Sequence, residues 1–214
     1  MARALLHARL VGTLATLAAE VEQRLADVES DRDALSGELA SRERQLSQLM
    51  NLYVATYQLH ATLDVAEVRA TIGEIATNVL GAEDFALLFW KADGSGCEIA
   101  LAPGLMEDPL YGARVYYGGD AAVDATLSDG VMRLGPIDGS TALVVVPLTV
   151  QAQTLGALVV TRLLGHRPPL GNEDREVLDL LAAHAASALV AAGAYQQADR
   201  KVKSLRSVIE LVSR

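Results

Sequence analysis

Side chains able to do chemistry are few and scattered in this chain. Its four histidines are His7, His60, His166 and His184. No two of them stand at a spacing typical of metal ligands, so the sequence predicts neither a zinc site nor a haem site. The single cysteine, Cys97, has no basic neighbour to lower the pKa of its thiol, and we interpret it as a small buried core residue, with a redox sensor as the alternative. No phosphate-binding loop, nucleophile elbow or informative carboxylate pair is recognisable, so we expect neither an enzyme nor a cofactor.

A cluster of tyrosines and aspartates is the main candidate for polar recognition. Tyr111, Tyr116 and Tyr117 are close in sequence, and alternation along a strand sends Tyr116 and Tyr117 to opposite sides of a sheet. One of them could stack on a planar ligand or simply fill a cavity. Asp124 and Asp129 could bind the polar edge of a ligand or lie solvated at the surface. The cluster marks a candidate pocket and leaves its occupancy open.

The composition is that of a globular domain with an acidic surface. Hydrophobic residues make up 51% of the 214 residues, enough to bury a sizeable core. The net charge is −9, whereas a general nucleic-acid binder needs a basic surface, so no nucleic-acid partner is expected. The uncharged stretch 10–19 is far shorter than the roughly 20 residues of a spanning helix, and a single cysteine fits a reducing compartment. We therefore expect a cytoplasmic protein without membrane insertion.

The N-terminal region carries a stripe of apolar residues typical of a coiled coil. No proline precedes Pro103, so long unbroken helices are possible. From Val21 the apolar residues recur in alternating steps of four and three, interrupted at Arg32 and Arg42. The members of this N-terminal stripe, assigned to a dimer interface, are Val21, Leu25, Val28, Leu35, Leu39, Leu46, Leu49 and Tyr53. The alternative is a single amphipathic helix that folds back on its own domain.

A second stripe predicts a long C-terminal helix that begins near Asn172. Its early part should pack on a sheet, and its later part is expected to meet a partner helix. The members of this C-terminal stripe that we assign to the dimer interface are His184, Tyr195, Val202, Leu205, Ile209 and Val212. Two copies of both helices could form a parallel four-helix bundle. The basic run Arg200, Lys201, Lys203 and Arg206 is interpreted as the outer face of the coiled coil, with an acidic partner or anionic lipid as alternatives.

Turn residues divide the region between the stripes into short elements. Asp64 with Glu67 predicts a capping box for a helix over 65–80, and Gly81 predicts its end. Strands are expected over 85–91, 97–102, 114–117, 131–134, 143–149 and 155–162, with a short helix over 121–128 capped by Asp120. A turn is expected at Pro168 and Pro169. The last two strands form a hairpin.

Four segments together resemble a GAF domain over about residues 52–197. Asp64 with its helix resembles the first helix of that family, and the run 85–90 resembles its first strand. Pro147-Leu148 followed by the run 156–160 resembles the strand-turn-strand core, and Leu170 with Glu173-Asp174 resembles the entry into the final helix. The resemblance implies an α+β fold: an antiparallel five- to six-stranded sheet with helices on both faces, plus long N-terminal and C-terminal coiled-coil helices.

The resemblance also implies a regulatory role without catalysis. In ligand-binding members the pocket holds cyclic nucleotides, bilins, haem or small metabolites. Here the pocket would be built from Phe85, Leu87, Phe89, Ile99, Tyr116, Tyr117, Asp124 and Met132. The signature of cyclic-nucleotide phosphodiesterase regulatory domains is not recognisable, and Cys97 lacks the adjacent histidine of many bilin attachment sites.

Three parts are therefore expected: a helical coiled coil over residues 1–59, a GAF-like domain over 60–197, and a coiled-coil extension of the last helix over 198–214. The expected function is that of a non-catalytic, homodimeric regulatory or scaffold protein that acts through protein–protein interaction in a signalling pathway. The alternative is a sensor with a nucleotide or metabolite in the pocket. No kinase, cyclase, phosphodiesterase or DNA-binding region is recognisable, so the output is expected to pass through a protein partner.

Overall fold

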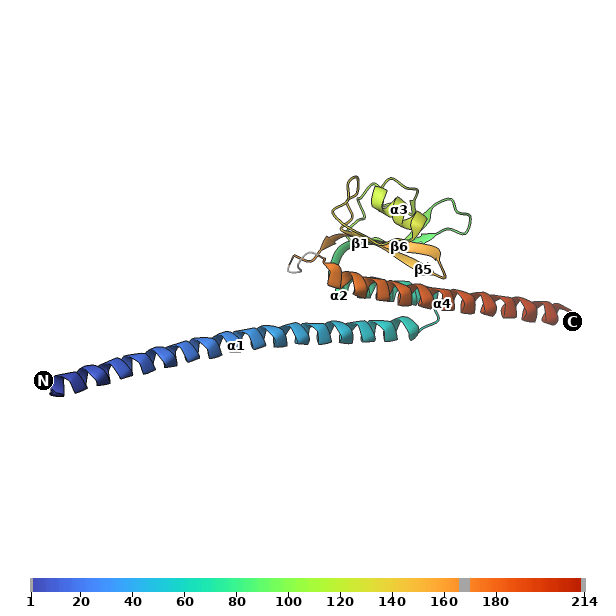
Figure 1. Ribbon diagram of the computed structural model, residues 1–214. Coiled ribbons are helices and arrows are strands. Elements are labelled where there is room, and N and C mark those ends of the chain that lie inside the picture. The colour runs from blue at the N-terminus through green and yellow to red at the C-terminus, as the bar shows by residue number, and fades with distance from the viewer. Residues whose placement is uncertain (1, 166–169, 213–214) are drawn as a thin grey trace. The chain divides into compact units, whose positions relative to one another are not determined.

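The computed structural model describes residues 2–165 and 170–212 (Figure 1). The chain consists of two units. The first unit ends at Leu49 and the second, which is compact, begins at Met50. Helix α1, Ala2–His60, crosses this boundary. The compact unit begins earlier than residue 60, the expected start of the domain, because Leu52, Ala55 and Leu59 of α1 are buried in its core. The turn expected at Pro168 and Pro169 lies outside the described residues.

A six-stranded antiparallel sheet forms the centre of the compact unit. Its strands are β1 (Ala82–Trp90), β2 (Cys97–Leu101), β3 (Val115–Tyr116), β4 (Arg133–Leu134), β5 (Val144–Val150) and β6 (Gln153–Leu163). They lie in the order β3-β2-β1-β6-β5-β4. Opposite residues include Phe85 and Val160 in β1 and β6, and Val146 and Leu158 in β5 and β6. The expected α+β fold class and strand number are confirmed.

Helices cover both faces of the sheet (Figure 1). Two hydrophobic cores flank the sheet. The α2/α4 core lies between one face of the sheet and helix α2 (Val65–Asn78), helix α4 (Asn172–Val212) and the last turns of α1. The α3 core lies between the other face and helix α3 (Ala121–Asp129). Because side chains alternate along a strand, neighbouring residues enter different cores. Leu87 and Val146 pack in the α2/α4 core, whereas Leu88 and Val145 pack in the α3 core.

Local hydrogen bonds set the start of α2. The Asp64 carboxylate accepts hydrogen bonds from the backbone N–H groups of Ala66 and Glu67 at 2.8 and 3.1 Å, which confirms the expected N-cap. The expected capping box is not completed, because the Glu67 carboxylate accepts from the Thr62 hydroxyl instead. The backbone N–H of Asp64 donates to that same hydroxyl at 3.1 Å. A nearby threonine therefore takes the bond that the glutamate would have accepted.

Strand β6 depends on two unusual backbone features, one in the turn before it and one where it meets β1. Its two-residue turn, Gln151-Ala152, has φ values of 49° and 64°, as a type I′ turn requires. Gly156 lies opposite Phe89, and a Cβ there would come within 1.9 Å of the Leu88 carbonyl oxygen. A glycine is therefore needed for β1 and β6 to approach each other.

Candidate functional site

The structure does not bring the eight expected pocket residues together. Phe85, Leu87 and Phe89 point from β1 into the α2/α4 core, and Met132 belongs to the same core. Tyr116 is buried in the α3 core on the opposite face, and Ile99 packs against that core. The grouping of all eight around one pocket is therefore wrong. Alternation along β1 identifies two sets of side chains, but it does not reveal which set faces which layer of helices.

Three of the expected residues do meet in an open hollow beside α3. Tyr116, Tyr117 and Asp124 line this hollow of about 420 Å³ together with Trp90 and Cys97. We call it the α3 hollow. Tyr116 is buried and Tyr117 is 75% exposed, yet both line this hollow. Strand β3 ends at Tyr116, so strand alternation does not extend to Tyr117.

Asp124 ties the parts of the α3 hollow together. Its Oδ1 accepts a hydrogen bond from the Tyr116 hydroxyl at 2.7 Å, and its Oδ2 accepts one from the backbone N–H of Gly119 at 3.0 Å. Burial, and then the hydrogen bond to Asp124, raise the pKa of Tyr116 above its ordinary value. The tyrosine therefore stays neutral and acts as a hydrogen-bond donor. The carboxylate holds the start of α3 against β3.

Tyr116, which lines the α3 hollow, packs against a second buried tyrosine, Tyr111. The rings of Tyr111 and Tyr116 stack with centroids 5.7 Å apart and an interplanar angle of 5°. Both tyrosines are almost completely buried. The Tyr116 ring is therefore packed face to face against a neighbouring ring.

Cys97 begins β2 at the edge of the α3 hollow and is buried. Burial, and then the charge of Asp124, raise the pKa of its thiol to about 11. A thiol with this pKa is almost entirely protonated at neutral pH, and the thiolate is the nucleophile and the metal ligand. Cys97 is therefore chemically quiet in this fold.

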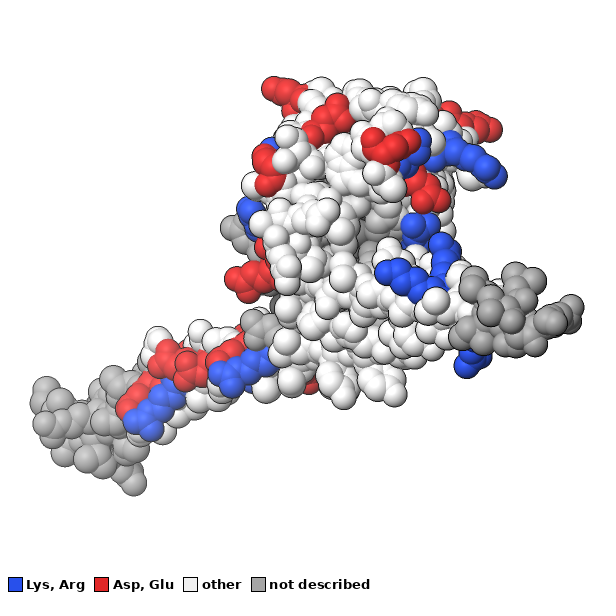
Figure 2. All heavy atoms as spheres, turned by 90° about the vertical axis from the view of Figure 1, so that its right-hand side faces the viewer, with Lys and Arg blue, Asp and Glu red and all other residues white. Residues whose placement is uncertain are grey.

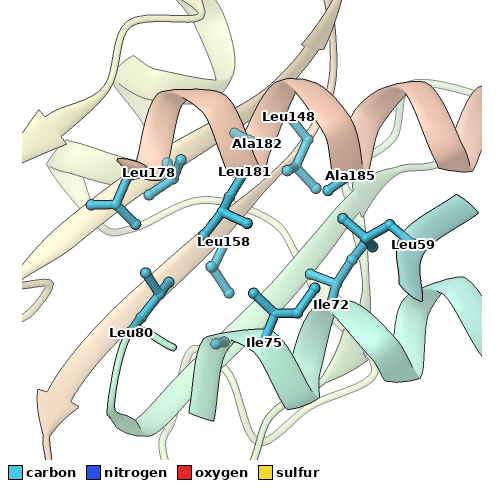
Figure 3. Close-up of a pocket in the computed structure, with 12 residues that line it drawn as sticks. Leu59, Ile72, Ile75, Leu80, Leu148, Leu158, Leu178, Leu181, Ala182 and Ala185 are labelled. Atoms are coloured by element: carbon cyan, nitrogen blue, oxygen red, sulfur yellow. The ribbon is translucent and has the colours of Figure 1, made fainter. Parts of the chain in front are cut away.

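A small apolar pocket lies on the other face of the sheet (Figure 3). Its volume is about 30 Å³. Its wall is entirely apolar, with Leu59 from α1, Ile72 and Ile75 from α2, Leu148 and Leu158 from the sheet, and Leu178 and Leu181 from α4 among its members. A cavity of this size could hold about one water, but it offers no polar group to bind it. It is a packing defect between the helices and the sheet, too small for a nucleotide.

The N-terminal stripe is exposed along its described length. Its seven members from Val21 to Leu49 are 58–63% exposed, and Tyr53 is 70% exposed. The interrupting Arg32 and Arg42 are paired within the helix, with Asp33 at 2.8 Å and Glu38 at 2.6 Å. The stripe is thus an exposed apolar surface interrupted by two arginines, each of which is paired with an acidic side chain.

The C-terminal stripe changes character along α4. His184 is half-buried, whereas Tyr195, Val202 and Leu205 are exposed. The side chains of Ile209 and Val212 lie outside the described part of the chain. Between Leu178 and Ala192 a neighbouring side of α4, which includes Leu181 and Ala188, is buried against the sheet. The helix therefore presents one face to the domain core and another to the outside.

The fold also brings together two residues that sequence spacing did not connect. The imidazole rings of His60 and His184 lie edge to face, with centroids 5.8 Å apart and an interplanar angle of 83°. His60 follows Tyr53 by seven residues, which is one heptad. Extending the N-terminal stripe by one heptad would therefore have predicted that His60 lies on the same face of the helix. Within the described residues, no group of three or more His, Cys, Asp or Glu side chains is arranged to hold a metal ion.

Comparisons with known proteins agree on the architecture. The sequence matches the GAF domain family over residues 64–190. No curated protein sequence matches it significantly. The GAF domain of a phosphoenolpyruvate-protein phosphotransferase from Coxiella burnetii superposes with a TM-score of 0.59 at 17% identity, covering 71% of this chain and 98% of that chain. The corresponding domain from Acinetobacter gives 0.58 at 11% identity, with the same coverage.

The GAF-B domain of DevS from Mycobacterium smegmatis gives a TM-score of 0.51 at 24% identity, covering 63% of this chain and 98% of that chain. At identities below 25%, these superpositions show that the fold is alike. The family match covers more than half of the chain. The six-stranded sheet, with α2 and α4 on one face and α3 on the other, is accordingly that of a member of the GAF domain family, whose domains serve as regulatory or sensor modules in signalling proteins.

Proposed function

We propose that this protein is a non-catalytic regulatory module that works as a homodimer and passes its signal to a protein partner. The exposed N-terminal stripe carries the proposal. Its apolar side chains recur at heptad spacing, yet all of those from Val21 to Leu49 are more than half exposed in the single chain. Heptad stripes of this kind are buried when two helices pair.

The helix itself needs such a partner. Isolated helices are marginal in water, and most of their stability in proteins comes from packing of the apolar face. The stretch up to Leu49 forms a unit of its own in the chain. A second copy of the chain carries the same stripe, so two copies can bury their stripes against each other. Twofold symmetry is the commonest arrangement of homo-oligomers.

The signal is proposed to travel as a change in register or splay of the paired helices. The last turns of α1 provide the connection, because Leu52, Ala55 and Leu59 are buried with α2, α4 and the sheet. A shift of α1 would therefore disturb the core of the GAF domain, and a change in the domain would move the helix. Well-packed cores respond to such shifts by switching rather than by continuous deformation.

The absence of catalysis is proposed from the condition of the reactive groups. The thiol of Cys97 is buried with a raised pKa, and both carboxylate oxygens of Asp124 already accept hydrogen bonds. Neither group is prepared as a nucleophile or a general base.

We propose a protein partner in the cytoplasm rather than nucleic acid or a membrane. Figure 2 shows acidic and basic side chains interspersed around a broad uncharged area. Residues Asp174–Ser207 of α4 are long and apolar enough to cross a membrane, but a core helix passes the same test. Leu178, Leu181 and Ala185 of this segment are buried in the domain, which favours the core interpretation.

Disulfide trapping tests the proposal. Position 39 belongs to the N-terminal stripe, and in a parallel, in-register dimer it faces its own copy. Leu39→Cys should therefore form a covalent dimer on mild oxidation, whereas Ser41→Cys, exposed on the same turn but off the stripe, should not. Native mass spectrometry of the unmodified protein should give a dimer. A monomer by mass, or equal cross-linking of both variants, would refute the proposal.

A small-molecule sensor is the second candidate, favoured by the α3 hollow. Its volume of about 420 Å³ lies within the usual range for ligand sites, and exposed aromatic rings beside a carboxylate suit a ligand with both apolar and polar parts. The test is a stoichiometric small-molecule adduct in the native mass spectrum. Asp124→Ala should remove the adduct and Asp93→Ala, on the β1–β2 turn, should keep it. A spectrum without any adduct favours the interaction module.

A further inference from the structure

His60 and His184 lie close enough for both imidazoles to reach one metal ion. Their ring centroids are 5.8 Å apart. With Zn–N bonds of about 2.0–2.1 Å, two imidazoles on one tetrahedral zinc ion have ring centroids roughly 5 Å apart. Rotation of the two side chains about their χ angles would close the difference. In the edge-to-face arrangement, at 83°, the edge of one ring faces the plane of the other, so the rings must turn before their nitrogens converge on an ion.

We propose that His60 and His184 form half of a divalent transition-metal site, and that a second copy of the chain supplies the other half. This inference rests on the dimer of the proposed function. Two imidazoles leave two of the four positions around a tetrahedral ion open. No third ligand is grouped with them among the described residues of one chain.

The position of the pair explains why a second copy would complete the site. His60 stands one heptad after Tyr53 and is exposed, as Tyr53 and Tyr57 are. In a parallel dimer the residues of one core heptad position lie against their own copies across the twofold axis. His60 would therefore face His60 of the second copy. Because His184 contacts His60, both histidine pairs would lie at the same height along the paired helices.

The chemistry of the surroundings selects the class of ion. Four neutral imidazoles suit Zn²⁺, Co²⁺, Ni²⁺ or Cu²⁺, and they are poor ligands for Mg²⁺ or Ca²⁺, which prefer oxygen. His60 ends α1, at the junction between the N-terminal helix and the GAF domain. An ion there would lock the end of α1 to α4 in both protomers. The site would thus couple metal availability to the helix register.

Zinc titration of the full chain tests the site. The protein, freed of metal with EDTA, is titrated with Zn²⁺ by calorimetry, and its mass is measured by native mass spectrometry. One Zn²⁺ per two chains is expected. His60→Gln and His184→Gln should each lower the affinity at least about tenfold, whereas the double variant His7→Gln/His166→Gln, which removes the remaining histidines, should bind as tightly as the unchanged protein.

The outcomes separate the site from the dimer. A dimer in EDTA whose zinc binding is the same with and without His60 and His184 would overturn the metal site and leave the proposed function intact. One Zn²⁺ per chain would also overturn it, because the two pairs would then not meet. A monomer in EDTA and in zinc would overturn both proposals. A dimer in EDTA that binds one Zn²⁺ per two chains, and only when both histidines are present, would support the site.

Discussion

Shortening two leucines of the N-terminal stripe should abolish the dimer. Leu39 and Leu46 are each 62% exposed in the single chain, and this area is what a partner helix would cover. Replacing leucine by alanine removes apolar groups worth about 2.4 kcal/mol when fully buried, at about 0.8 kcal/mol per CH₂. Scaled to the exposed fraction, each side chain contributes about 1.5 kcal/mol to association.

The symmetric dimer contains four such side chains, so Leu39→Ala/Leu46→Ala should weaken it by about 6 kcal/mol. At about 1.4 kcal/mol for each factor of ten, the dissociation constant should rise by about 10⁴-fold, or about 10³-fold if neighbouring losses are not additive. Alanine is the strongest helix former, so the helix itself should survive. The loss therefore reports on pairing rather than on folding.

Sedimentation equilibrium over a wide range of protein concentration measures this effect. The matched control is Ser41→Ala/Ser47→Ala, two exposed positions of the same turns that lie off the stripe. The control should associate like the unchanged protein. If the leucine double variant also keeps its full affinity, the stripe is not the interface and the reasoning from its spacing and exposure fails.

Three further predictions concern the domain. Asp120→Ala should lower the free energy of unfolding by about 3 kcal/mol in chemical denaturation, because it removes a buried carboxylate that accepts hydrogen bonds from Ala122, Val123 and Ser140. Asp64→Ala, which removes an exposed cap, should lower it by only about 1 kcal/mol. Equal losses would contradict the role of burial. Gly156→Ala should cost about 3 kcal/mol or prevent folding, since its Cβ would meet the Leu88 carbonyl, whereas Gly37→Ala, with open space around it, should stabilise its helix by about 1 kcal/mol. Because the pKa of Cys97 is raised, the thiol of the folded protein should not react with thiol reagents below pH 9. The unfolded thiol, with a pKa of 9.0, loses its proton first, so the stability that Cys97 contributes is fully present below pH 9 and is lost as the pH rises through about 11. Fast labelling of the folded protein would refute this.

Local patterns in the sequence predicted most of the elements. The heptad spacing of the N-terminal stripe predicted a helix, and α1 extends over 59 residues. Asp64 and Asp120 predicted the starts of α2 and α3, and both carboxylates cap those helices. These features depend on a few neighbouring residues and on the periods of helix and strand, so a single stretch of sequence contains the information.

Relations between distant segments were not contained in any such stretch. Phe85, Leu87 and Phe89 were expected around the pocket, but they pack in the α2/α4 core on the opposite face of the sheet from Tyr116. His60 and His184 showed no ligand spacing in the sequence, yet the fold places their rings in contact. Alternation and heptad spacing divide side chains into faces by local geometry alone, whereas the layer that each face meets depends on how the whole chain buries its apolar surface. The sequence by itself determined the helices, the strands and their caps, and only tertiary packing decided which side chains share a site.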